Sequence, residues 1–181
     1  MKGGVFKSHL TWVADHKTPG ERQTLMNALS PEARQGLSGS ILASTWFPFA
    51  WLVELDRAMM DIYGHGSLEF LQDLGRYSAK INLSTTYRVF NRDTNHEFFQ
   101  NSALLHAQFQ DFGKAAYVKS GETAGKMIHT EYQCFSPVFC ASAIGYYEGV
   151  ILSHGSKSAT VRETECQCYG DKSCTFEMKW S

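Results

Sequence analysis

Four side chains near the C-terminus have the types and the spacing of a metal site: Cys140, Glu163, Cys166 and Cys174. Thiolates and carboxylates are among the ligands that a zinc ion prefers, usually four of them in a tetrahedron. Cys166 and Cys174 flank a short glycine-containing connection, and a hairpin there would bring the two thiols together. Cys140 falls near the start of a predicted helix, where unpaired backbone N–H groups favour a thiolate. The sequence therefore predicts a zinc ion. Because four protein ligands leave no open position for a reacting water, this ion would be structural rather than catalytic.

The strand that carries two of these ligands has halves that are out of phase. If the apolar side chain of Val161 is buried, the odd-numbered residues of this strand face inward. If Cys166 is buried as a ligand, the even-numbered residues face inward instead. A β-bulge near Thr164 would restore the phase and put Glu163 and Cys166 on the same side. Cys168 remains an alternative to Cys166, because both occupy the same predicted face.

Capping signals and apolar periodicity predict the elements that must position these residues. Residues 5–15 fit a strand or a short helix. Ser30 is followed by Pro31, which is typical of a helix start. A further helix is predicted from Trp46 to the break at Gly64–Gly66, and the next one begins after its cap at Ser67. A capping box formed by Thr94 and Glu97 begins another helix, which ends at Gly113. The last predicted helix extends from Ser136 to about Leu152.

Strands are predicted over residues 115–119, 126–132, 158–168 and 174–180. The last one is the clearest, because apolar and polar residues alternate along it. Small residues in the helix of 136–152, such as Gly145 and Gly149, would let another backbone approach closely. We therefore expect an α+β fold, with N-terminal helices packed on a small antiparallel sheet of about four strands and one helix inserted before the last two strands.

Composition narrows the classes of protein. With 181 residues, 43% hydrophobic, the chain is long enough for one domain with a core. The net charge of −1 offers no basic face for nucleic acid. No apolar run approaches the roughly 20 residues of a membrane helix, and the start of the chain lacks a signal-peptide pattern. Five cysteines, an odd number, fit a reducing compartment, so we expect a cytoplasmic protein.

The spacing Cys-x22-Glu-x2-Cys-x7-Cys from Cys140 to Cys174, ending in Gly-Asp-Lys-Ser-Cys-Thr-Phe, resembles the vinyl-reductase-type small-molecule-binding domain. That domain is the sensory part of aromatic-responsive bacterial transcription activators, and it is similar to subunits of the eukaryotic transport-protein-particle complex. The resemblance implies that the three cysteines and the glutamate bind a structural zinc. It covers the C-terminal part of the chain closely, and the whole chain is similar to a family abundant in myxobacteria and related predatory bacteria.

The resemblance implies one domain over 1–181, with 1–45 as an N-terminal extension or subdomain and 46–181 as the ligand-binding core of vinyl-reductase type. It also argues against phenol as the ligand, because Lys119 and Ile144 stand where the aromatic sensors have aromatic side chains. Nothing marks a histidine as an axial ligand of haem. We expect ligand contacts from aromatic and neighbouring side chains at helical or strand spacing: Trp51, Phe70, Tyr77, Phe98, Leu105, His106, Phe109 and Tyr117.

These observations favour a stand-alone domain of bacterial signalling that binds an apolar molecule, either a lipid or an aromatic compound, and acts as a homodimer or through a protein partner. A protein-interaction or scaffold module of transport-particle-like fold is the alternative. An enzyme is not expected, because the sequence contains neither a phosphate-binding glycine loop nor an assignable acid and base pair.

Overall fold

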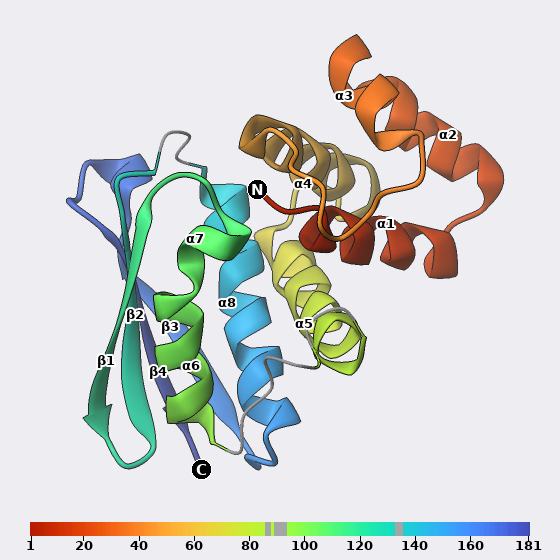
Figure 1. Cartoon of the computed structure of the whole chain (residues 1–181). Coiled ribbons are helices and arrows are strands. Elements are labelled where there is room, and N and C mark those ends of the chain that lie inside the picture. The colour runs from red at the N-terminus through yellow and green to blue at the C-terminus, as the bar shows by residue number, and fades with distance from the viewer. Residues whose placement is uncertain (86–87, 89–93, 133–135) are drawn as a thin grey trace.

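The computed structural model describes residues 1–85, 88, 94–132 and 136–181. Over these residues the chain has an α+β fold, with eight α-helices and one four-stranded antiparallel sheet (Figure 1). The predicted fold class is confirmed. The helices are α1 (Gly4–His16), α2 (Pro19–Ala28), α3 (Pro31–Leu37), α4 (Phe49–Tyr63), α5 (Leu68–Ser84), α6 (Asn95–Leu104), α7 (His106–Phe109) and α8 (Pro137–Ser153).

The sheet consists of β1 (Lys114–Gly121), β2 (Ala124–Thr130), β3 (Ala159–Glu165) and β4 (Cys174–Trp180), in the order β1-β2-β4-β3. The register between β3 and β4 shifts between Glu163 and Glu165, so the bulge predicted near Thr164 is present. A short 3-10 helix, Gln167–Tyr169, continues from β3. The predicted strand over 158–168 is therefore shorter, and its last residues turn toward β4.

Side-chain caps mark the starts of three of the predicted helices. The side chains of Ser30, Ser67 and Thr94 accept hydrogen bonds from backbone N–H groups of α3, α5 and α6. Ser136 makes no such side-chain bond to α8. The helix predicted from Thr94 to Gly113 is broken at Leu105, so that α7 forms a separate turn.

The N-terminal segment that fitted a strand or a helix is α1, and it packs against α5. Helix α8 lies between α5 and the sheet, while α6 covers β1 (Figure 1). Close approach of α5 and α8 depends on glycine, because a Cβ at Gly145 would overlap the backbone oxygen of Gln72. The predicted role of the small residues of α8 is thus confirmed. No helix in the described part of the chain is long and apolar enough to cross a membrane.

Candidate ligand pocket and sulfur cluster

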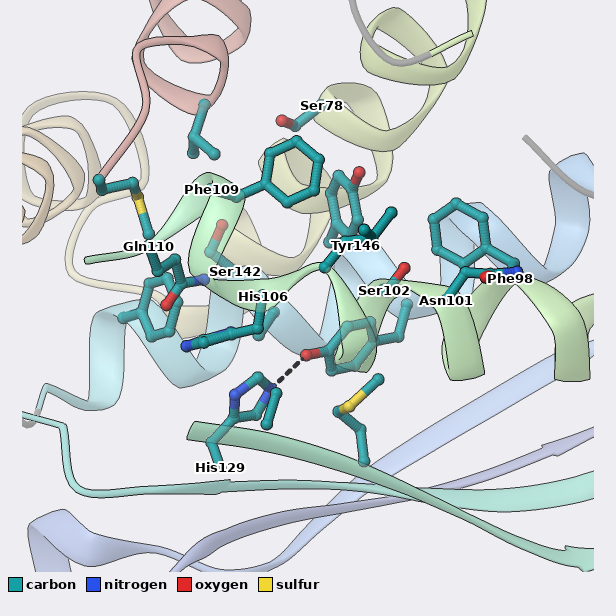
Figure 2. A pocket seen from close by; sticks show the side chains of 18 of the residues that line it. Ser78, Phe98, Asn101, Ser102, His106, Phe109, Gln110, His129, Ser142 and Tyr146 are labelled. Atoms are coloured by element: carbon teal, nitrogen blue, oxygen red, sulfur yellow. Dashed lines mark hydrogen bonds between the residues drawn. The ribbon is translucent and has the colours of Figure 1, made fainter. Parts of the chain in front are cut away.

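A cavity of about 180 Å³ lies among α1, α5, α6, α7, α8 and the sheet. Figure 2 shows Ser78 of α5 at one end, His129 of β2 at the other, and Phe109 of α7 near Ser78. The walls are mainly apolar, with a few polar side chains among them. This composition is typical of a small-molecule site, where apolar surface provides affinity and a few polar groups fix the orientation of the ligand.

The structure places four of the eight predicted contact residues in the wall of this cavity: Phe98, Leu105, His106 and Phe109. The other four lie elsewhere and have their own partners. Trp51 covers Gly36, Phe70 packs edge-on against Trp12, the hydroxyl of Tyr77 donates to Asp15, and the hydroxyl of Tyr117 bonds His96.

Two histidines from different elements face the cavity with their ring nitrogens engaged. His129 bonds the hydroxyls of Tyr147 and Tyr132 through its two nitrogens, each at 2.6 Å. Burial, assisted by the nearby His106, lowers the pKa of His129 to about 3. His106 forms a bond of 3.0 Å from Nε2 to the carbonyl oxygen of Phe112, and burial lowers its pKa as well. Both imidazoles are therefore neutral near pH 7.

The opposite wall, formed by α1 and α5, contains polar residues that sequence analysis did not identify. His9 lines the cavity, and its Nδ1 lies 2.7 Å from Oδ1 of Asp56 on α4. His9 is 1% exposed and Asp56 is 0% exposed. Among the described residues, His9 Nε2 and Asp56 Oδ2 have no hydrogen-bond partner. No local sequence signal could reveal this pair, because its two members are brought together only by the packing of α1 on α4.

The four predicted metal ligands converge on one point at the end of the sheet. One candidate ligand atom from each of Cys140, Glu163, Cys166 and Cys174 lies within 4.8 Å of the other three. The sulfur of Cys140 is 3.9 Å from that of Cys166 and 3.8 Å from that of Cys174. These separations are far longer than a disulfide bond of roughly 2.05 Å. Cys168 lies outside the group.

The connection between β3 and β4 holds this sulfur cluster in shape. Asp171 accepts a hydrogen bond from the backbone N–H of Cys166, and Gly170 has the left-handed conformation that closes the turn. The backbone N–H of Gln167 points to the sulfur of Cys174. The bond from Cys140 lowers the pKa of Cys174 to about 7, while the same pairing and burial raise the pKa of Cys140. The cluster thus favours one thiolate, on Cys174.

Comparison with known proteins identifies the fold. No model of a protein family matches the chain, and no curated protein matches it in sequence. Solved H-NOX structures match over its whole length. An H-NOX protein from S. oneidensis in the Fe(II)NO ligation state is 12% identical, with a TM-score of 0.75, 100% of this chain and 99% of that chain covered.

Two further H-NOX structures agree. An Fe(II) unliganded H-NOX protein mutant from K. algicida is 12% identical, with a TM-score of 0.74. The match covers 100% of this chain and 97% of that chain. An oxygen-binding H-NOX domain related to soluble guanylate cyclases is 14% identical, with a TM-score of 0.71. The match covers 100% of this chain and 95% of that chain. The chain therefore has the H-NOX fold.

This finding corrects two predictions. The resemblance to the vinyl-reductase-type domain and to transport-particle subunits is wrong, because the fold is that of H-NOX domains. The alternative of a protein-interaction or scaffold module assumed a transport-particle-like fold, which the chain does not have. Zinc as the cofactor of the domain is also wrong by this comparison, since the structures of the same fold are described by their iron or heme. The shared spacing of a short C-terminal segment did not identify the fold.

Proposed function

We propose that the chain is a sensory domain that binds a small molecule in the cavity of about 180 Å³, and that it acts by binding rather than by catalysis. Two observations support this proposal. Structures of the same fold are described as binding oxygen or as ligated by NO. The observation that carries it is in the chain itself: His9 Nε2 and Gln110 Oε1 belong to residues of the wall and are buried without a partner among the described residues.

Unpaired polar atoms in a buried wall are costly. A buried donor or acceptor without a partner loses roughly 1–3 kcal/mol relative to a satisfied one. A bound molecule with a hydrogen-bonding group would recover that free energy. The two atoms therefore favour a ligand that combines an apolar body with a polar group, which is narrower than the apolar lipid or aromatic molecule expected from the sequence.

Haem is the group that the fold suggests, and the residues of this cavity do not fit it. Pockets that hold drug-sized ligands measure roughly 300–1,000 Å³, and haem is large among such ligands. The cavity here measures about 180 Å³. His106 offers the right kind of axial donor, but its Nε2 is bonded to the carbonyl of Phe112.

The charge of the wall leads to the same conclusion. Haem carries two carboxylates, and buried carboxylates need cationic or hydrogen-bonding partners. None of the described side chains that line the cavity is a lysine or an arginine, and the α-ammonium group of the lining residue Met1 is already paired with Asp111 at 3.0 Å. We therefore infer a ligand other than haem.

The volume sets the size of the ligand. A protein cavity of roughly 150 Å³ accommodates benzene. The cavity of about 180 Å³ is slightly larger and so matches a single ring with one substituent. Because the resemblance that argued against phenol is overturned, phenol becomes a suitable probe.

A pair of variants on β1 tests the site. Ala115 lines the cavity, whereas Ala116 is exposed on the other face of the same strand. Ala115→Leu fills the cavity, and Ala116→Leu is the matched control. Phenol should raise the Tm of the wild type and of Ala116→Leu, because a ligand that binds only the folded state stabilises it. The shift should vanish in Ala115→Leu. An equal shift in both variants would place the ligand elsewhere.

Titration with hemin tests the exclusion of haem. We expect no saturable Soret band. A one-to-one complex that is lost in His106→Ala would contradict the proposal and would identify haem as the occupant.

The sulfur cluster is a separate proposal. Cys140, Glu163, Cys166 and Cys174 are proposed as one set of metal ligands, without assignment of a metal, because their ligand atoms lie within 4.8 Å of one another. Elemental analysis of protein purified without chelator is the test. A bound metal should be lost in Cys174→Ala and retained in Cys168→Ala, and protein free of metal would refute this proposal.

A further inference from the structure

His9 and Asp56 form a buried pair that the packing of the core does not explain. Their bond of 2.7 Å joins α1 to α4, and both side chains are almost fully buried. An apolar pair would join the two helices without the cost of desolvating two ionisable groups. The second ring nitrogen of His9 has no partner among the described residues, although the residue lines the cavity.

The buried polar groups next to His9 on α1 and α5 have partners, and of these Ser78 lines the cavity. Ser8 Oγ donates to the carbonyl of Val5 at 2.8 Å, so the hydroxyl of Ser78 must donate to Ser8 Oγ, 2.5 Å away. Asn82 donates to Ser78 Oγ in turn. Of these groups on α1 and α5, His9 is the one with a buried polar side-chain atom, Nε2, that has no partner among the described residues.

We propose that His9 Nε2 is the ligand-recognition atom of the cavity, held in place by Asp56, and that it selects a ring-sized molecule carrying a hydroxyl group. This inference rests on the proposed function and specifies its ligand class. Asp56 engages Nδ1, which leaves Nε2 as an acceptor in the neutral imidazole and as a donor in the imidazolium. A hydroxyl both donates and accepts, so it satisfies Nε2 in either state.

The apolar part of the ligand lies against the other walls. Phe98, Leu105, Met127 and Phe139 line the cavity and offer surface for a ring. The described lining residues include no lysine or arginine, and the α-ammonium group of Met1 and the imidazole of His9 are already paired with Asp111 and Asp56, so no cation is left to pair with an anionic ligand. The site therefore selects a ligand by the size of its ring and by one neutral hydroxyl group.

Phenol and toluene make a direct test, because they differ in one hydroxyl that replaces a methyl group. Isothermal titration calorimetry at pH 7 should show that wild-type protein binds phenol about tenfold more tightly than toluene, since toluene leaves Nε2 unpaired. His9→Phe should bring the ratio of the two dissociation constants to about one. His16→Phe, on the exposed face of the same helix, should leave the ratio unchanged.

His9→Gln provides the second variant if His9→Phe does not fold. Its amide can reach the position of Nε2 and should keep part of the preference for phenol. Equal affinities in the wild type, or a preference that persists in His9→Phe, would overturn the role of His9 while leaving the cavity as a ligand site. Binding of neither compound to the wild type would overturn the proposed function together with this inference.

Discussion

Acid should destabilise this protein through His129 in particular. Burial lowers the pKa of His129 to about 3 in the folded state, against an ordinary value of 6.5 in the unfolded chain. Below pH 6.5 the unfolded state therefore binds a proton that the folded state does not, and the free energy of unfolding falls as the pH falls. The loss is about 1.4 kcal/mol per pH unit, or about 3 kcal/mol between pH 6.5 and pH 4, from this one group.

His129→Gln isolates this contribution. At pH 7 the variant should be less stable than the wild type by about 2–4 kcal/mol, because the hydroxyls of Tyr132 and Tyr147 lose a well-placed partner. As the pH falls, the free energy of unfolding of the wild type decreases through His129, whereas the variant has no imidazole at this position to protonate. Other groups, including His106, titrate in both proteins, so their contributions largely cancel in the difference.

Urea unfolding at several values between pH 7 and pH 4 measures the effect, with His16→Gln as a control for the loss of an exposed histidine. The stability difference between wild type and His129→Gln should shrink by about 3 kcal/mol over this range. A difference that stays constant with pH would show that His129 is not held neutral between the two tyrosines.

Further predictions concern packing and the sulfur cluster. Gly145→Ala should destabilise the protein by about 3 kcal/mol or more in urea unfolding, because its Cβ would overlap the backbone of Gln72 and force two helices apart. Gly20→Ala, which meets no atom within 4 Å, should instead be neutral or stabilising by up to about 1 kcal/mol. Cys174→Ala should cost about 1–2 kcal/mol through lost contacts in the buried cluster, whereas Cys168→Ala should stay within about 0.5 kcal/mol; equal costs would contradict a special role for the cluster.

Local signals in the sequence predicted the elements well. Ser30, Ser67 and Thr94 cap the helices that follow them, because a cap depends on a few adjacent residues. The bulge at Thr164 was predictable for a related reason, since a strand with one buried face must keep its phase. The convergence of Cys140 with Cys166 was predicted on other grounds, from the types and spacing of the four residues as metal ligands.

The pocket was less predictable. An apolar stripe shows which face of a helix is buried but not what lies opposite it, so Trp51 and Phe70 were assigned to a cavity when they pack among the N-terminal helices. The pair of His9 and Asp56 depends on the tertiary packing of two helices. The α+β fold class was predicted correctly, but the resemblance to the vinyl-reductase-type domain was wrong, because a short metal-ligand spacing constrains only a hairpin and one helix end, which unrelated folds can share.

A crystal structure of the protein soaked with phenol would show directly whether the cavity is a ligand site and whether His9 contacts the ligand. We predict one ring in the cavity of about 180 Å³, with its hydroxyl within hydrogen-bonding distance of His9 Nε2. A cavity that stays empty in crystals that tolerate saturating phenol, or that holds haem on His106, would contradict this prediction.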